Sequence, residues 1–485
     1  MREMHTRGVI PRWHARLAGV LDQGAATFPV TNPATGHVIA QVSACRRQHV
    51  LLALEAACSV ESDLRDADSN KKAMLLRTWA AMLAQEADRV ATTVTIETGK
   101  PISEARREVR AAVRVIESYA GSSSQSKVSA VIEYRDEWQL KRQLRGIGPV
   151  VAITNWCQPV LTVVRRVAPA FVAGCPVILK PSSRTPLSAL TIANLWSDAG
   201  APEGSLQVLT TDDPLATTDV CLADPRVAMV SFTGSRDVGL HLARMCADVR
   251  RDAFLEVDGQ MPFIVLADAD VERAADAVIE VTFMRNSGQD CTSSNRVYVD
   301  QRIASQFVSA VAARASELRH GDPLDEHTEV GPLIDSLTLT IIEEQIEDSV
   351  ADGAVVVAGG KRLGGLYFAP TVLDRVRPGM RVVEDAHAGP LLPVLRFTDG
   401  DELIEMTSSG RKGRCAWIWT RDDGIAHRLA AKMGYQDVWI NDVGETYPDR
   451  SEARIAWGDL GEAARYLRSV TIASSACEIE AKREK

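Results

Sequence analysis

Four consecutive apolar residues, Val150 to Ile153, constrain the fold of this chain more than any other stretch. A strand that is apolar on both faces needs helices on both sides of its sheet, which is the arrangement found in parallel α/β sheets. The run opens a series in which strand, loop and helix repeat, with further strands expected at 176–179 and 227–232. The sequence therefore predicts an α/β protein with a largely parallel sheet in this region.

Length and composition exclude several classes of protein. A chain of 485 residues is too long for one hydrophobic core, so two or three packed units are expected. The net charge of -9 argues against a nucleic-acid binder. No apolar run is long enough to span a membrane, and the segment Met1 to Val20 lacks the apolar core of a secretory signal. We expect a cytoplasmic protein with neither nucleic-acid nor membrane partners.

The nine cysteines are odd in number, widely scattered and never spaced as C-x-x-C. Such spacing indicates neither a disulfide framework nor a zinc site. The sequence therefore predicts a reduced protein without a metal centre.

Helical patterns precede the first buried strand, at 48–60, 71–95 and 103–120. Gly99 and Pro101 end the second pattern, because glycine supplies a C-cap and proline cannot continue a helix. The stretch 128–145 alternates loosely between apolar and charged residues, as an exposed hairpin or arm does. Such an arm buries little by itself, so we expect it to contact a partner subunit.

Two helix starts follow the buried strands. Thr185 and Pro186 suit the N-cap and first residue of a helix over 187–198. Thr233, Gly234 and Ser235 end a strand and open a helix, an arrangement in which backbone amides and a hydroxyl can hold a phosphate. This is not the G-x-G-x-x-G of the ordinary dinucleotide fold, and taken alone it is better explained as a structural turn.

Two further residues have features of catalytic groups. Glu256 lies inside the apolar run 253–257, where a carboxylate is costly unless it is paired, neutral or functional. Cys291 follows a Gly-Gln turn and precedes small hydroxyl residues, a setting in which its sulfur can face a cleft. The alternative for an isolated cysteine is a small, buried, hydrophobic side chain.

Taken together in their order and spacing, these stretches resemble the aldehyde dehydrogenase superfamily over nearly the entire chain. The matching stretches are 174–182 with Thr185 and Pro186, 232–235 with Gly239, Glu256 with Gly259, and 286–291. The resemblance implies a doubly wound cofactor-binding domain at 1–125 and 146–257 and an α/β catalytic domain at 258–440. It also implies a small β oligomerisation arm with a C-terminal segment, at 126–145 and 441–485, and a homodimer or homotetramer.

The resemblance assigns roles to individual residues. Cys291, as thiolate, is expected to attack the aldehyde carbon, hydride then passes to the nicotinamide, and Glu256 activates the water that hydrolyses the thioester. Cofactor contacts are expected from Trp156, Lys180, Ser183, Gly234, Ser235 and Val257. Because Ser183 replaces the glutamate of many NAD-preferring relatives, the cofactor is expected to be NAD or NADP.

Two arginines suggest the substrate. Arg165 and Arg285 resemble the pair that holds the distal carboxylate in succinate-semialdehyde dehydrogenases. A guanidinium fork suits a carboxylate, whereas exposure on the surface is the alternative for either arginine. The sequence thus predicts NAD(P)-dependent oxidation of an aldehyde to a carboxylic acid, with a semialdehyde such as succinate semialdehyde as the expected substrate.

The family's oxyanion donor is missing. Cys157 stands where the family has the asparagine that donates to the oxyanion, and Asn155 or Gln158 can replace it only if the loop shifts. Loss of one such donor typically costs about a hundred- to a thousandfold in turnover.

Other positions depart from the pattern as well. Asp258 replaces a glycine after Glu256, Ala386 replaces the glutamate that grips the nicotinamide ribose, and Ala388 replaces a phenylalanine near the ring. A catalytically weakened relative with a binding or assembly role is therefore the alternative to an active enzyme.

Overall fold

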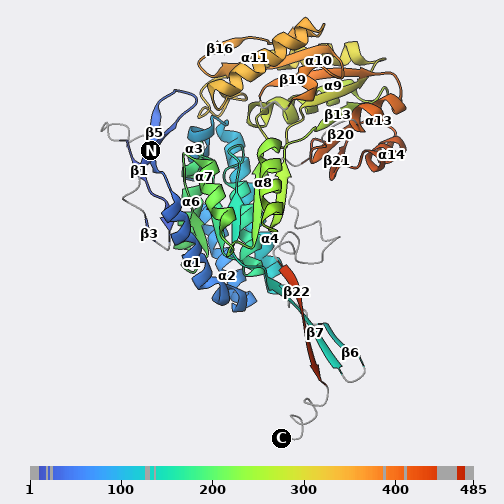
Figure 1. Ribbon diagram of the computed structural model, residues 1–485. Coiled ribbons are helices and arrows are strands. Elements are labelled where there is room, and N and C mark those ends of the chain that lie inside the picture. The colour runs from blue at the N-terminus through green and yellow to red at the C-terminus, as the bar shows by residue number, and fades with distance from the viewer. Residues whose placement is uncertain are drawn as a thin grey trace.

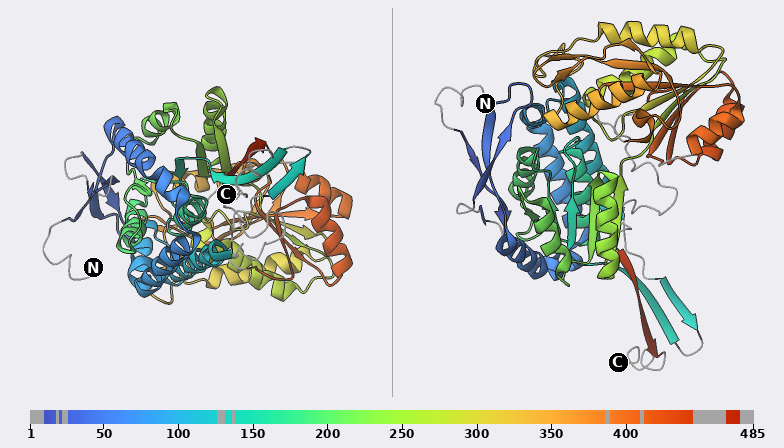
Figure 2. Two further views of the ribbon diagram at one scale, coloured as in Figure 1. Left: turned by 90° about the horizontal axis from the view of Figure 1, so that it is seen from below. Right: turned by 45° about the horizontal axis from the view of Figure 1, so that its top comes forward.

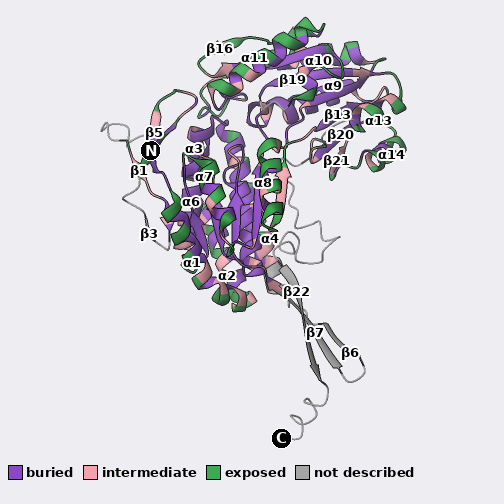
Figure 3. Cartoon of the chain, viewed as in Figure 1, coloured by how far each residue is buried: buried purple, intermediate pink, exposed green. Residues whose placement is uncertain are grey.

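The computed structural model describes residues 10–17, 20–21, 26–125, 131–135, 138–385, 389–408, 412–444 and 467–475. Two seven-stranded sheets, each flanked by helices, form two lobes, and a narrow β arm projects from the first lobe (Figures 1 and 2). Burial follows the strands of both sheets, while the outer faces of the helices are exposed (Figure 3). The α/β fold expected from the sequence is confirmed.

The sheet of the first lobe has the strand order β12-β11-β8-β9-β10-β2-β3. Its parallel strands are β8 (Val150–Ile153), β9 (Val177–Lys180), β10 (Leu206–Val208), β11 (Met229–Gly234) and β12 (Asp252–Val257). The short strands β2 (Arg16–Leu17) and β3 (Val20–Leu21) extend one edge in antiparallel pairing. Every residue of β8 and β9 is buried, as expected for strands covered on both faces.

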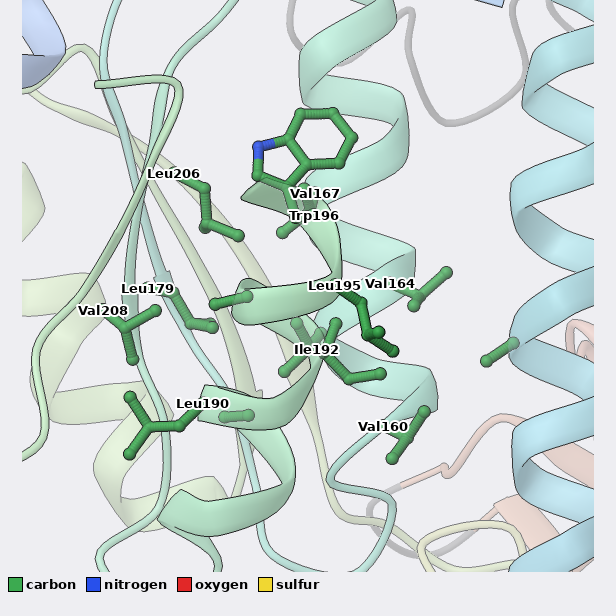
Figure 4. Packing of buried hydrophobic residues seen from close by; sticks show 14 of the residues in the cluster. Val160, Val164, Val167, Leu179, Leu190, Ile192, Leu195, Trp196, Leu206 and Val208 are labelled. Carbon is green, nitrogen blue, oxygen red and sulfur yellow. The ribbon is translucent and has the colours of Figure 1, made fainter. Parts of the chain in front are cut away.

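Helices α1 to α8 belong to this lobe: α1 (Arg47–Asp66), α2 (Ser69–Gln85), α3 (Ala87–Thr98), α4 (Ile102–Gln125), α5 (Leu161–Ala173), α6 (Pro186–Asp198), α7 (Pro214–Ala223) and α8 (Arg236–Asp248). Apolar side chains of α5, α6, β9 and β10 pack together in one core cluster (Figure 4). The single helix expected over 71–95 is wrong, because Glu86 leaves helical geometry (φ -94°, ψ 11°) and separates α2 from α3.

The start of α6 is capped from a distance. Pro186 is the first helical residue, as predicted, but the Thr185 side chain does not cap the helix. Instead the buried carboxylate of Glu97 in α3 accepts from the backbone amides of Leu187 and Ser188 and from the Ser188 hydroxyl. These contacts satisfy amides that the first turn of a helix leaves unpaired, while burial raises the pKa of Glu97 to about 8.

The sheet of the second lobe has the order β15-β18-β19-β14-β13-β20-β21. Its parallel strands are β13 (Pro262–Val265), β14 (Arg296–Asp300), β18 (Thr371–Val376), β19 (Leu391–Phe397), β20 (Cys415–Trp419) and β21 (Asp437–Ile440), and β15 (Val355–Ala358) is antiparallel at one edge. The helices of this lobe are α9 (Val271–Ile279), α10 (Ala304–Glu317), α11 (Ser336–Ala351), α12 (Arg381–Glu384), α13 (Gly400–Ser408) and α14 (Asp423–Met433). A two-stranded ribbon, β16 (Arg362–Gly364) and β17 (Tyr367–Phe368), accompanies them.

Two small sheets complete the fold. Near the N-terminus, β1 (Arg12–Trp13), β5 (Val38–Ser43) and β4 (Thr27–Thr31) form one. The arm consists of β6 (Val131–Arg135), β7 (Trp138–Gly146) and β22 (Leu467–Ser475), with β22 antiparallel to β7. The expected hairpin is therefore present, and a C-terminal segment adds its third strand. No helix within the described residues is long and apolar enough to cross a membrane.

Candidate active site

A cleft of about 850 Å³ is lined by residues of both lobes. On the first lobe it meets the carboxyl ends of β8, β9 and β11, which is where open α/β sheets bind ligands. On the second lobe it meets the loop that carries Cys291. Six residues predicted from the sequence line it: Trp156, Lys180, Ser183, Gly234, Ser235 and Cys291.

The loop that carries Cys291 contains three consecutive residues with left-handed backbone conformations. Helix α9 continues into a π-helical turn at 280–284, and Asn286 (φ 48°) and Ser287 (φ 56°) then adopt the left-handed conformation. Gly288 is also left-handed (φ 74°), and a Cβ at this position would lie 2.2 Å from the Gly389 carbonyl oxygen. Only glycine fits there, and such strained turns are common at functional sites.

Hydrogen bonds hold this loop against its surroundings. The Ser287 hydroxyl accepts from the amide of Gly331 at 2.8 Å, and Gln289 Oε1 accepts from the amide of Ile334 at 2.8 Å. Asp290 is buried, and its carboxylate accepts from both Gln158 Nε2 (2.8 Å) and the amide of Thr292 (2.7 Å). Cys291 is thus positioned by a rigid frame, which is what a catalytic group needs.

Two side chains, those of Asn155 and Cys157, lie beside Cys291, which is half-buried. Asn155 Nδ2 lies 3.8 Å from the Cys291 sulfur, and the Thr162 hydroxyl donates to Asn155 Oδ1 at 3.2 Å. Cys157 is buried and interacts with both the side chain and the backbone of Cys291. The contact with the Cys291 side chain and burial raise the pKa of Cys157 well above its usual value, so Cys157 stays protonated.

Glu256 does not line the cleft. Its side chain is 23% exposed, and its carboxylate accepts from Arg165 at 3.2 Å, from Arg166, and from the Thr233 hydroxyl at 3.2 Å. The Arg166 guanidinium is itself buried and lies 4.9 Å from the centroid of the Phe254 ring. Two guanidinium groups hold the Glu256 carboxylate in ion pairs, so Glu256 must leave them to reach a water molecule. That role stays a prediction.

The two predicted substrate arginines are both engaged by the protein. Arg165 pairs with Glu256, and its side chain is 15% exposed. Arg285 is 2% exposed and donates to the carbonyl oxygens of Thr292 (3.2 Å), Val443 (2.9 Å) and Gly444 (3.4 Å). Neither is a solvated surface arginine, so that alternative is wrong. Their role as carboxylate anchors stays a prediction.

The start of α8 fits a phosphate-bearing cofactor. Ser235 is the N-cap residue and lines the cleft, but its hydroxyl makes no capping hydrogen bond. The buried Nε of Arg236 also has no partner within the described residues. Free amides at a helix start, a free hydroxyl and an adjacent guanidinium form a suitable anion site. Val257 lies beside this helix, where a Cβ on Gly239 would meet its side chain at 2.3 Å.

Two further cationic side chains, Lys180 and Arg184, line the cleft. Lys180 is buried at the end of β9, and burial lowers its pKa to about 8. The Arg184 guanidinium lies 5.9 Å from the centroid of the Trp156 ring and pairs with Asp335. No carboxylate stands at Ser183, where one would repel a 2′-phosphate. The residues present fit NAD and NADP.

Asp258 is a cleft residue to which sequence reasoning gave no role. Its carboxylate has no hydrogen bond or ion pair with the part of the chain that the structure describes, although it lines the same cleft as Cys291. Desolvation by the surrounding protein, with a smaller effect of Asp290, raises the pKa of Asp258 to about 6. The replacement of a glycine by a charged residue beside Glu256 was the available sequence signal.

Some sequence predictions cannot be placed. Ala386 and Ala388 lie outside the described residues. Within those residues, no group of three or more histidine, cysteine, aspartate or glutamate side chains can hold a metal ion, and all cysteines are free thiols.

Comparisons with known proteins agree with this site. The model of the aldehyde dehydrogenase family matches residues 20–453, and the chain therefore belongs to that family. Like its relatives, it is an NAD(P)-dependent aldehyde dehydrogenase.

Two relatives and one solved structure illustrate the match. The chain is 35% identical over 415 residues to a glutarate-semialdehyde dehydrogenase of Pseudomonas putida, covering 86% of each protein. It is 34% identical over 414 residues to an NADP(+) succinate-semialdehyde dehydrogenase of Escherichia coli, covering 85% and 86%. The crystal structure of a succinate-semialdehyde dehydrogenase from Burkholderia pseudomallei aligns with a TM-score of 0.89 and 31% identity over 96% of this chain and 98% of that one. The resemblance seen in the sequence is confirmed.

Proposed function

We propose that this aldehyde dehydrogenase oxidises a semialdehyde that carries a terminal carboxylate, with NAD or NADP as hydride acceptor. The observation that carries the catalytic part is the Cys291 thiol, which lines the cleft on a rigid loop opposite the helix start at Ser235. The substrate class is supported by the activities for which the two relatives above are named and by Arg165, whose side chain is 15% exposed.

The chain's own residues perform distinct tasks in this reaction. The Cys291 sulfur forms a bond to the aldehyde carbon, and the carbonyl oxygen takes the electron pair of the broken π bond. The cofactor, which accepts the hydride when bound, is held by Ser235, the first amides of α8 and Lys180. Loss of hydride from that carbon to the cofactor would let the oxygen re-form the carbonyl and leave a Cys291 thioester. Water then attacks the thioester, with Glu256 taking its proton, and the acid and the Cys291 thiolate are released.

Arg165 is the arginine that we expect to bind the carboxylate of the substrate. Arg165 pairs with Glu256 at 3.2 Å, and both side chains are partly exposed. If the substrate carboxylate paired with Arg165, Glu256 would lose one of the contacts that hold it in place. Substrate binding and release of the base are therefore linked in this proposal.

The test compares NADH and NADPH production from succinate semialdehyde, glutarate semialdehyde and an uncharged aldehyde of similar length. A charge-assisted contact of about 1.5–3 kcal/mol predicts a kcat/KM roughly ten- to a hundredfold higher for the semialdehydes. Equal values for all three would remove the semialdehyde part of the proposal. No turnover of any aldehyde, together with no cofactor binding, would instead favour a binding or assembly role.

The nucleophile is tested by Cys291→Ala, which should reduce turnover to background because no other group replaces the attacking sulfur. Cys58→Ala, a half-buried thiol on α1, is the matched control and should retain turnover. Activity that survives Cys291→Ala would show that the nucleophile is misassigned.

A further inference from the structure

The oxyanion that forms when Cys291 attacks an aldehyde needs a side-chain donor, and Cys157 stands where the family supplies it. A thiol is a weak donor, and Cys157 is buried and interacts with the side chain and the backbone of Cys291. Gln158 is not free either, because its Nε2 donates to both oxygens of Asp290, at 2.8 and 2.9 Å. Two of the three polar side chains in this loop, Cys157 and Gln158, therefore already interact with other groups of the protein.

We propose that Asn155 is the oxyanion donor of this enzyme, so that the amide has moved two positions along the loop from the site now held by Cys157. Asn155 Nδ2 is the side-chain amide that faces the Cys291 sulfur, at 3.8 Å, and it lines the same cleft. This inference rests on the proposed function, since it concerns the attack of Cys291 on an aldehyde.

The orientation of Asn155 is fixed by its neighbours. It follows the buried strand β8, and its Oδ1 accepts from the hydroxyl of Thr162 in the first turn of α5. With the oxygen engaged there, the two N–H groups face the cleft and the sulfur. The carbonyl oxygen of a substrate is one carbon away from the attacking sulfur, so a donor in contact with the sulfur also reaches that oxygen.

The step involves only Cys291, the aldehyde, Asn155 and the hydride acceptor of the proposed function. As the sulfur–carbon bond forms, the π pair of the carbonyl moves onto oxygen, and Nδ2–H donates a hydrogen bond to the new negative charge without transferring its proton. When hydride leaves the carbon, the carbonyl re-forms and the hydrogen bond weakens. Asn155 therefore binds the transition state more tightly than the aldehyde, which is the requirement for a gain in kcat.

The experiment compares Asn155→Ala and Cys157→Ala with the wild type, with semialdehyde and cofactor in excess. Asn155→Ala should lower kcat by about a hundred- to a thousandfold with KM within about threefold, because the lost contact exists only in the transition state. Asn70→Ala, which removes an exposed amide from α2, is the matched control for amide loss. Adding Cys157→Asn to Asn155→Ala returns an amide to the family position and should recover at least about tenfold in kcat.

A second readout does not depend on turnover. Asn155→Asp keeps the shape of the side chain but replaces the donor beside the sulfur by a negative charge. The rate of Cys291 alkylation by iodoacetamide should therefore reach its midpoint at higher pH than in the wild type. Thermal melting of each variant checks that it is folded.

Three results would overturn the assignment. The first is an Asn155→Ala variant that retains kcat within about threefold of an active wild type. The second is a larger loss of kcat in Cys157→Ala than in Asn155→Ala. The third is an alkylation midpoint that does not move in Asn155→Asp. A wild type that turns over no aldehyde would overturn the proposed function and this donor role together. An active wild type with an unimpaired Asn155→Ala would overturn the donor role alone.

Discussion

At the scale of the residue, Asp258 is expected to add a modest pH dependence to the stability of the protein, because its side chain is exposed and water weakens the effect of its raised pKa. Its pKa is about 6 in the folded protein, against roughly 4 in an unfolded chain. As pH rises from 4 to 6, the unfolded state loses this proton first, so the contribution of Asp258 to the free energy of unfolding falls and then stays low above pH 6.

Asp258→Asn should therefore raise the melting temperature at pH 7.5 and have little effect at pH 4.5, where the wild-type carboxyl is largely protonated. Calorimetry at both pH values measures this, and Asp252→Asn, which changes an exposed aspartate at the start of β12, is the matched control. If the melting temperatures of Asp258→Asn and the wild type differ by the same amount at both pH values, the expected titration of Asp258 is contradicted.

The residue scale also shows where sequence reasoning stops. It named Cys291 as the nucleophile and placed Lys180 and Ser235 among the cofactor contacts because each belongs to a local motif. It did not anticipate that Arg165 pairs with Glu256 or that Glu97 caps α6, since those partners are distant in sequence and meet only in the folded chain. The choice between Asn155 and Gln158 depended on which side chain Asp290 engages, and that is a tertiary contact.

At the scale of the element, Arg285 joins the nucleophile loop to the segment after β21. Its guanidinium donates to Thr292 on one side and to Val443 and Gly444 on the other, and it lies 5.7 Å from the centroid of the Trp417 ring. Arg285→Met would leave buried carbonyl oxygens without donors, which costs about 1–3 kcal/mol for each unsatisfied group.

We therefore expect Arg285→Met to lower the free energy of unfolding by about 2–4 kcal/mol in urea titrations and to slow semialdehydes and uncharged aldehydes alike. Arg244→Met, an exposed arginine on α8, is the control. Unchanged stability with a raised KM for semialdehydes alone would instead identify Arg285 as the anchor of the substrate carboxylate.

At the scale of the whole molecule, the cleft forms only when two lobes meet. Asn155, Lys180 and Ser235 follow strands of the first sheet, whereas Cys291 precedes β14 of the second. Periodicity predicted the first sheet, because it is a local property of the chain, and the family resemblance implied the second α/β domain. The distances across the cleft depend on how the lobes pack, and no local pattern contains that information.

The β arm is the part of the molecule whose stability is hardest to explain in a single chain. It is a three-stranded sheet that projects from the first lobe, with β6 and β22 at its two edges (Figures 1 and 2). Small isolated sheets are marginally stable in water, and open edges are templates for pairing with another chain. We therefore expect the arm to pack against a second copy, in a dimer or tetramer of the 52.7 kDa chain.

Deleting residues 467–485 removes β22 and leaves β7 with an open edge, so the truncated protein should sediment as a smaller species than the wild type. Analytical ultracentrifugation measures the masses, and the melting temperature with cofactor affinity shows whether the lobes remain intact. Because the cleft is built without the arm, cofactor binding should survive while assembly is lost. A wild type that sediments as a monomer would remove the assembly role of the arm.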